Sequence, residues 1–290
     1  MSVSIDGRPH ILCWRMTLAD EVVYTLTAFD GIEIVVRSYG AGDPVVLIHG
    51  ATIDATYNWV QSGIASAIVD AGYHVVMPDL RGHGASGKPI DAGALSLDAF
   101  TSDVRLILDA FDLARTALVG YSLGSMIALE TASRDERVSA VVAGGVSLEG
   151  MQRKPLSPER DAYVAQLAVD RDDDVTDPRA RQTRAWDRDH GFDPRARAAL
   201  IRALHTPWAV NVESVQVPTL VVNGDGDPSP DSLVAVLASA RGARVKGDHA
   251  SALGDPAMAA LIVDFLDEFT PQANDGVEVA EERNQRRLGG

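Results

Sequence analysis

Residues 117–129 have the sequence ALVGYSLGSMIAL, in which an apolar run meets a second apolar segment at Gly120-Tyr121-Ser122-Leu123-Gly124. The first run predicts a buried strand and the second a helix, so Ser122 lies at a sharp strand-to-helix turn. The glycines on either side let backbone segments approach where a Cβ would not fit. The N-terminus of the following helix favours negative charge beside the hydroxyl. The stretch therefore predicts a serine nucleophile, and the plainer alternative is a tight glycine turn with an exposed serine.

The composition predicts a protein that buries a sizeable core and does not bind nucleic acid or anionic membranes. The 290 residues are 46% hydrophobic and 23% charged, with a net charge of −15. Such an acidic surface argues against nucleic acid and anionic membranes as partners. The single cysteine, Cys13, permits no disulfide within the chain, which favours a cytoplasmic location. The oligomeric state is left open, with a homodimer as one option.

Segments that would signal export, membrane insertion or a cofactor are not predicted. The first ten residues lack the apolar stretch of a signal peptide, and no apolar run reaches the roughly 18 residues that cross a bilayer. Residues 225–236 superficially resemble a calcium-binding loop, but two prolines interrupt them and Val236 stands where the bidentate glutamate belongs. Phosphate-binding loops, Cys/His metal sets and dinucleotide fingerprints are also missing. We therefore expect neither a metal nor a cofactor.

The order of apolar segments predicts the fold class. Two β-rich runs, residues 21–26 and 32–38, flank Asp30-Gly31 and predict a hairpin. Apolar periodicity then predicts further strands over 45–48, 74–77, 117–121, 138–142, 217–222 and 244–246, and helices over 59–70, 97–111, 123–133, 230–238 and 256–269. This alternation is typical of a doubly wound, mostly parallel α/β sheet, whose ligands bind beyond the carboxyl ends of the strands.

Between residues 147 and 213 the alternation stops, and charged residues and prolines become dense. We interpret this stretch as a helical cap inserted after the sixth strand. The expected division is a core over 1–146 and 214–270, the cap over 147–213 and a mobile tail over 271–290. Side chains that are candidates to line a moderately apolar substrate pocket are Tyr121 in the core and Met151, Tyr163, Leu167, Trp186, Trp208 and Val210 in the cap. Packing of the cap onto the sheet is the alternative role for these cap residues.

A serine nucleophile requires a general base, and a histidine base requires an acid that fixes its tautomer. Among the histidines, His249 follows the last predicted strand and precedes the last predicted helix. The loop after the strand over 217–222 offers Asp225 and Asp227, and Glu149 is a third candidate acid. Asp227 is favoured because it lies deeper in the loop, directly before a proline.

Five motifs in chain order extend this pattern: HGA at 49–51, PDLRGHGAS at 78–86, GYSLG at 120–124, VPTLVVNGDGD at 217–227 and DH at 248–249. With them, residues 29–269 resemble the α/β-hydrolase superfamily. The resemblance implies Ser122 as nucleophile, Asp227 as acid and His249 as base, in the superfamily's chain order. It also implies an oxyanion hole formed by the backbone N–H groups of Ala51 and Leu123.

The resemblance implies a serine hydrolase that cleaves a small carboxylic ester, thioester or lactone through an acyl-enzyme. Haloalkane dehalogenases and epoxide hydrolases of the superfamily use an aspartate nucleophile, so Ser122 argues against those chemistries. Hydrolysis of a C–C bond, cleavage of an amide or iminopeptide, and hydroxynitrile cleavage remain alternatives on the same triad, as does a ligand-binding receptor without turnover. Ala51 is small where many relatives carry a bulky group, which is expected to open the acyl pocket.

Overall fold

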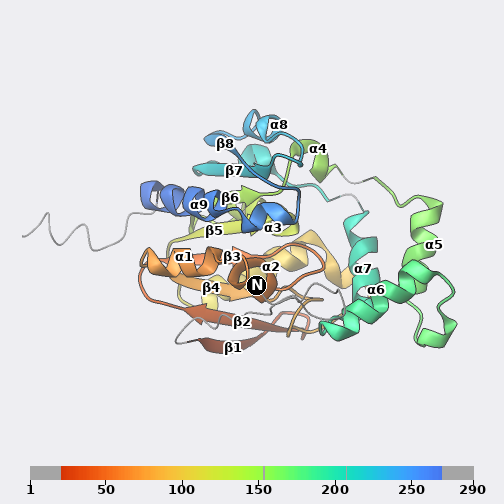
Figure 1. Ribbon diagram of the computed structural model, residues 1–290. Coiled ribbons are helices and arrows are strands. Elements are labelled where there is room, and N and C mark those ends of the chain that lie inside the picture. Colours follow the sequence, from red (N-terminus) through yellow and green to blue (C-terminus); the bar gives the residue numbers. More distant parts are fainter. Residues whose placement is uncertain (1–20, 153, 207, 270–290) are drawn as a thin grey trace, which may run out of the picture.

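The computed structural model describes residues 21–269 except residues 153 and 207. The expectations for Cys13, the first ten residues and the tail over 271–290 lie outside the described residues. The strands are β1 (Val22–Thr27), β2 (Glu33–Tyr39), β3 (Pro44–Ile48), β4 (His74–Pro78), β5 (Thr116–Tyr121), β6 (Val138–Gly144), β7 (Thr219–Gly224) and β8 (Ala240–Val245). They form one sheet in the order β1-β2-β4-β3-β5-β6-β7-β8 (Figure 1).

The pairing of the strands confirms the predicted fold class. β1 and β2 form the predicted antiparallel hairpin, and β2 also lies antiparallel to β4. Every other neighbouring pair, from β4-β3 through to β7-β8, is parallel. The carboxyl ends of β3, β5, β6, β7 and β8 therefore meet at one edge of the sheet, where the polar motifs of the sequence follow them.

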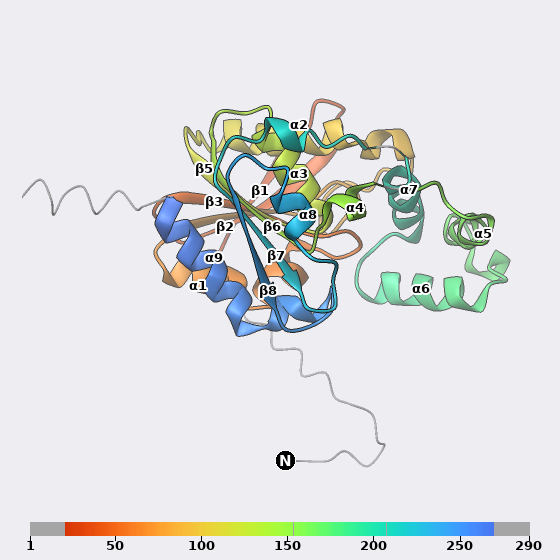
Figure 2. The same ribbon diagram turned by 90° about the horizontal axis from the view of Figure 1, so that it is seen from above.

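Helices cover both faces of the sheet (Figure 2). Outside residues 158–204, the α-helices of the described chain are α1 (Ile64–Asp70), α2 (Leu97–Ala110), α3 (Leu123–Ala132), α4 (Leu148–Met151), α8 (Asp231–Val234) and α9 (Pro256–Phe269). Side chains alternate between the faces along β3: Val45 and Leu47 pack in the apolar cluster with α1 and α9, whereas Val46 and Ile48 pack in the cluster with α2 and α3. Both faces of the central strands are thus buried, which explains their continuous apolar sequence.

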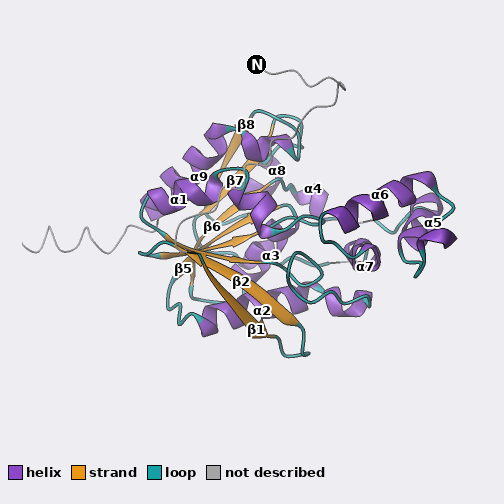
Figure 3. Ribbon diagram, turned by 60° about the horizontal axis from the view of Figure 1, so that its bottom comes forward, coloured by secondary structure: helices purple, strands orange, loops and turns teal. Residues whose placement is uncertain are grey.

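Three helices, α5 (Pro158–Leu167), α6 (Pro178–Asp189) and α7 (Pro194–Leu204), follow β6 and extend away from the sheet (Figure 3). Each begins with proline at its first position, after a serine or aspartate whose side chain accepts a hydrogen bond from the first turn. Three of the prolines in this stretch, Pro158, Pro178 and Pro194, therefore start helices. Val164 and Leu167 of α5 and Ala180 of α6 help form a separate apolar cluster, while Leu200 of α7 belongs to the main core.

Two predicted helices are shorter than expected. The helix predicted over 59–70 is divided into a π-helical turn, η1 (Thr56–Val60), and α1, because Gly63 between them has φ 81°. The helix predicted over 230–238 ends at Val234 in α8. Pairing of β8 with β7 begins at Ala240, so the chain must leave its helical conformation before that residue. Short 3-10 turns complete the described fold at η2 (Ala92–Leu95), η3 (Asp172–Asp174), η4 (Val212–Ser214) and η5 (Ser251–Gly254).

Candidate active site

Ser122 lies between β5 and α3 with φ 53° and ψ −110°, a conformation that residues with a side chain rarely adopt. Holding such a residue costs roughly 1–3 kcal/mol, which the surrounding fold must supply. Its backbone N–H donates to the carbonyl of Gly144 at the end of β6, at 2.8 Å. The turn is therefore fixed against the neighbouring strand, and the serine is presented at the carboxyl edge of the sheet.

The glycines of the serine turn are required by close backbone contacts. A Cβ on Gly124 would lie 1.9 Å from the carbonyl oxygen of Ile48, and a Cβ on Gly120 would lie 2.3 Å from the carbonyl oxygen of Gly124. These neighbours are backbone atoms, which cannot rotate away as a side chain can. The spacing of glycines around Ser122 in the sequence thus reports a real steric need, and it favours a strand-to-helix elbow over a simple surface turn.

His249 and Asp227 come from the loops after β8 and β7. The Nδ1 of His249 lies 3.1 and 3.2 Å from the two carboxylate oxygens of Asp227, whose side chain is only 10% exposed. A carboxylate accepts hydrogen bonds, so this contact places a proton on Nδ1 and leaves Nε2 free to act as a base. The half-exposed imidazole can therefore contact a substrate through Nε2 while Asp227 fixes its Nδ1.

The other two candidate acids have different partners. Asp225 accepts a hydrogen bond from the backbone N–H of Gly247 at 2.9 Å, which ties the loop after β7 to the loop before His249. Glu149 accepts from the Ser232 hydroxyl at 2.7 Å. Of the three carboxylates, Asp227 is the one that contacts the imidazole.

Ser122, Asp227 and His249 line one cavity of about 190 Å³, together with Met126 and Pro228 among others. Among the described residues, the Ser122 hydroxyl and the imidazole do not share a hydrogen bond. Catalytic hydrogen bonds are often long in the absence of substrate and shorten in the complex, so the common cavity is the relevant observation.

Tyr121 holds the histidine loop against the serine elbow. Its hydroxyl donates to the backbone carbonyl of His249 at 2.7 Å, and its ring centroid lies 5.5 Å from that of the imidazole. Burial raises the pKa of Tyr121, so its hydroxyl keeps the proton that it donates. The side chain, predicted to bind substrate, is thus buried and engaged with the His249 loop.

The loop after β3 passes beside the nucleophile, since a Cβ on Gly50 would lie 3.5 Å from the Ser122 Cβ. The N–H of Gly50 donates to the side-chain oxygen of Asn58 at 2.9 Å, and the N–H of Thr52 donates to Nε2 of His83 at 3.1 Å. In the described part of the chain, the backbone N–H of Ala51, between Gly50 and Thr52, has no hydrogen-bond partner. The backbone N–H of Leu123, at the start of α3, has none there either. The two predicted oxyanion-hole donors are thus free to bind.

Two buried histidines fix this loop. His83 donates from Nδ1 to the carbonyl of Arg81 at 2.9 Å, and His49 donates from Nδ1 to the carbonyl of Gly50 at 2.7 Å. Burial lowers the pKa of both imidazoles, that of His83 to about 3, so both are neutral and accept at Nε2. His83 accepts from the N–H of Thr52, and His49 accepts from the N–H of Leu80. Thr52 has φ 64°, a conformation that a β-branched residue seldom adopts.

Asn58 is the residue of this loop support that the sequence pattern did not indicate. It is fully buried in η1, and its side-chain Nδ2 has no hydrogen-bond partner among the described residues. A lone asparagine in the otherwise aromatic and apolar stretch over 57–60 was the available signal, because such a polar side chain must be satisfied locally when it is buried.

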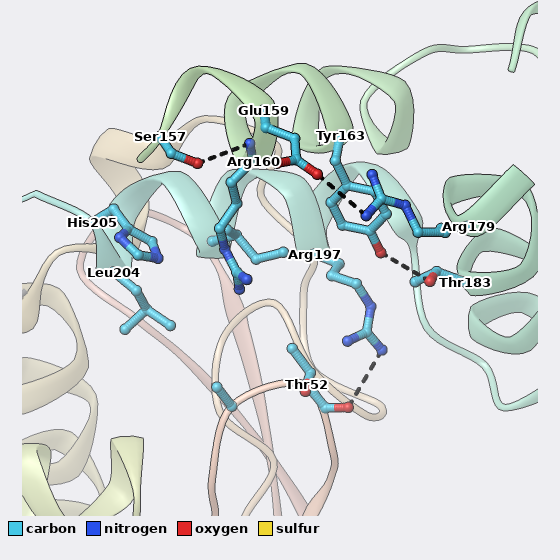
Figure 4. Close-up of a pocket in the computed structure, with 12 residues that line it drawn as sticks. Thr52, Ser157, Glu159, Arg160, Tyr163, Arg179, Thr183, Arg197, Leu204 and His205 are labelled. Carbon is cyan, nitrogen blue, oxygen red and sulfur yellow. Dashed lines mark hydrogen bonds and ion pairs between the residues drawn. The ribbon is translucent and has the colours of Figure 1, made fainter. Parts of the chain in front are cut away.

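A larger cavity of about 730 Å³ lies between the cap helices and the loop after β3 (Figure 4). Its lining is Ala51, Thr52, Ser157, Glu159, Arg160, Tyr163, Arg179, Thr183, Arg197, Ile201, Leu204 and His205. The predicted pocket was moderately apolar, whereas this one carries three arginines. Because Ala51 lines it, the larger cavity adjoins the predicted oxyanion hole.

The other residues predicted to line the substrate pocket are distributed over several environments. Tyr163 lines the larger cavity, and Leu167 is buried in the apolar cluster of the cap. Met151, Trp208 and Val210 line a third cavity of about 290 Å³. Trp186 is 38% exposed, with its ring 4.2 Å from that of His190 and 5.5 Å from that of Phe192. Tyr163 therefore lines the same cavity as Ala51 and Thr52 of the loop after β3. Met151, Trp208 and Val210 line a different cavity.

Over residues 21–269, none of the described helices is long and apolar enough to cross a membrane. Within the same described residues, no group of three or more His, Cys, Asp or Glu side chains is placed to hold a metal ion.

Comparisons with known proteins support the predicted fold class. The sequence model of the α/β hydrolase fold matches residues 43–172. An epoxide hydrolase from Caballeronia sordidicola is 36% identical over 115 residues, which cover 39% of this chain and 34% of that protein. A non-heme chloroperoxidase from Kitasatospora aureofaciens is 39% identical over 103 residues, or 34% of each protein. The match thus spans about a third of the length of these curated relatives. The crystal structure of a bromoperoxidase from Bacillus anthracis has a TM-score of 0.68 at 25% identity, covering 85% of this chain and 100% of that one.

Proposed function

Because the chain belongs to the α/β-hydrolase superfamily, we propose that it is a serine hydrolase that cleaves a small carboxylic ester, thioester or lactone through an acyl-enzyme. The observation that carries the proposal is the hydrogen bond between His249 and Asp227 beside the cavity that Ser122 also lines. In this reading, residues 1–146 and 214–270 form the catalytic core and residues 147–213 form the cap.

In the first half of the reaction, the Ser122 oxygen attacks the acyl carbon while His249 Nε2 takes the hydroxyl proton. The proton already on Nδ1 donates to Asp227, whose negative charge stabilises the imidazolium that forms. The carbonyl oxygen becomes an oxyanion and is met by the free N–H groups of Ala51 and Leu123. Removing one such donor from an oxyanion hole costs roughly 100- to 1,000-fold in rate.

Collapse of the tetrahedral intermediate breaks the bond to the leaving group, which takes the proton from His249 Nε2. The acyl group then remains on the Ser122 oxygen. In the second half, His249 removes a proton from water, and the resulting attack releases the acid and restores the serine hydroxyl. Apart from the substrate and this water molecule, no further reactant is needed to balance either half.

We do not assign to this chain the activities for which the curated relatives are named. The superfamily's epoxide hydrolases use an aspartate nucleophile, and this chain carries Ser122 at the elbow. C–C bond, amide and hydroxynitrile cleavage use the same triad and stay as alternatives, and a receptor would keep the triad without turnover.

Hydrolysis of 4-nitrophenyl acetate and butyrate, followed by release of nitrophenol, tests the proposal. The wild-type chain is expected to give a burst equal to its active-site concentration followed by steady turnover, because the activated nitrophenyl ester acylates Ser122 faster than water releases the acyl group. Ser122→Ala should abolish the burst, with Ser125→Ala as a control because the neighbouring hydroxyl donates to the Gly144 carbonyl, away from the cavity. A burst of the same size in Ser122→Ala, or none in the wild type together with no labelling by a fluorophosphonate, would exclude this function.

A further inference from the structure

The charge of the larger cavity differs from that of the molecule. The chain carries a net charge of −15, yet three arginines and one acidic residue, Glu159, line the space beneath the cap. Concave sites with low-dielectric walls strengthen the field of the charges that line them. Whether this cavity attracts an anion depends on which of the arginines are already neutralised by partners.

Two of the three arginines have acidic partners. Arg197 of α7 donates from Nε to both carboxylate oxygens of the fully buried Asp187, at 2.7 and 2.8 Å. Arg179 of α6 lies 3.3 Å from Asp177 and 3.6 Å from Glu159. Their charges are compensated within the cap, so these arginines contribute structure more than free positive charge.

Arg160 is different. Its backbone N–H donates to the Ser157 hydroxyl at 3.2 Å, which caps α5, but across the described residues no carboxylate lies within ion-pair distance of its guanidinium. In Figure 4 this side chain extends from α5 toward the loop that carries Thr52. An unpaired guanidinium presents a rigid fork of donors that matches a carboxylate or phosphate with two parallel hydrogen bonds.

The lining of the cavity also includes apolar side chains. Ile201 and Leu204 of α7 line it together with Arg160, and so does Ala51, whose N–H is a predicted oxyanion-hole donor. A ligand that fills this space would therefore place its reacting carbonyl at Ala51, a short aliphatic chain along α7, and a polar group at α5.

We propose that the cavity selects acyl substrates whose far end is anionic, a carboxylate or a phosphate that Arg160 binds. This proposal rests on the hydrolase function given above and names its substrate class. The anion is chosen because an arginine without a counter-ion gains more from an oxyanion partner than from any neutral one.

Three 4-nitrophenyl esters of equal chain length test the proposal: the monoester of adipic acid, the same monoester with its second carboxyl methylated, and the ester of 5-phosphonopentanoic acid. The wild type should show a higher kcat/KM for an anionic ester than for the methylated one. The carboxylate and phosphonate esters distinguish which oxyanion is preferred. Arg160→Gln should lower the anionic-to-neutral ratio of kcat/KM roughly tenfold, the size of one charge-assisted hydrogen bond.

Arg171→Gln is the matched control, because Arg171 is an exposed cap arginine that pairs with Asp173 and does not line the cavity. It should leave the ratio unchanged, and Arg160→Lys should retain part of it. A wild-type preference for the methylated ester, or an equal ratio in wild type and Arg160→Gln, would overturn the proposal.

Direct binding separates a failure of this proposal from a failure of the hydrolase function. Calorimetric titration of Ser122→Ala with monomethyl adipate and with phenyl phosphate needs no turnover. The dissociation constant for at least one anion should rise roughly tenfold when Arg160→Gln is added. Equal constants in the two variants would reject anion recognition even if every ester is hydrolysed.

Discussion

Replacing Asp227 by asparagine removes the negative charge behind the imidazole while keeping the side chain's size. The wild-type carboxylate lies 3.1 Å from His249 Nδ1 at its nearer oxygen. An asparagine can turn its NH₂ group toward that nitrogen, which would then hold no proton, so the tautomer with a free basic Nε2 is lost. We therefore expect the variant to fold normally and to lose most of its activity.

The size of the loss follows from the contact. Two unit charges separated by 3.1 Å interact by roughly 5 kcal/mol at an effective dielectric constant of about 20. Since the imidazole is 52% exposed, solvent screening reduces this figure to about 3–4 kcal/mol. At about 1.4 kcal/mol for each factor of ten, acylation should slow by roughly 100- to 1,000-fold.

The assay is the second-order rate constant for labelling by a fluorophosphonate, which needs the triad but not the natural substrate. Asp225→Asn is the matched control, because an asparagine oxygen can still accept the Gly247 N–H that Asp225 now accepts. It should change the rate less than threefold, and both variants should keep the wild-type circular dichroism. An Asp225→Asn loss as large as that of Asp227→Asn, or a loss below tenfold for the latter, would refute the assignment of the acid.

Three further predictions follow from the site. Gly124→Ala should destabilise the fold by about 3 kcal/mol or more in urea unfolding, since its Cβ would lie 1.9 Å from a β3 carbonyl oxygen; a loss under about 1 kcal/mol would contradict this. The pKa of His83, about 3 in the fold, lies below its ordinary value, so the unfolded chain binds the extra proton and stability falls between about pH 6.5 and 3. His83→Gln should flatten that loss, and parallel pH profiles would show that the imidazole is not held neutral against Thr52. Tyr121→Phe should lower kcat about fivefold with little change in KM, because the hydroxyl that positions His249 is lost; a change confined to KM would indicate a substrate contact instead.

The elements that surround Ser122 were predictable from local sequence. Apolar runs of strand length, the Asp30-Gly31 turn and the glycine spacing of the elbow each have a physical cause within a few residues, and the sheet follows from their order. Sheet geometry indicated that the loops after neighbouring parallel strands meet at one edge, and the resemblance implied Asp227 as the partner of His249. The structure has these two side chains in contact.

The character of the cap was less predictable. Its dense charge indicated a helical insertion, but the partner of each arginine depends on tertiary contacts that have no sequence period. Asp187 lies ten residues before its partner Arg197, on a different helix, and Trp186 packs on His190 and Phe192 at the surface of the cap. The charged lining of the larger cavity therefore could be recognised only from the positions of the cap helices in the structure.

The central claim is that Ser122, His249 and Asp227 act together, with the carbonyl oxygen held by Ala51 and Leu123. A crystal structure of the chain after reaction with a fluorophosphonate tests it most directly. We expect phosphorus bonded to the Ser122 oxygen, a phosphonyl oxygen about 2.7–3.1 Å from both backbone nitrogens, and the imidazole Nε2 within roughly 3.2 Å of the modified oxygen. An adduct on any other residue, or a phosphonyl oxygen turned away from the N–H groups of Ala51 and Leu123, would contradict it.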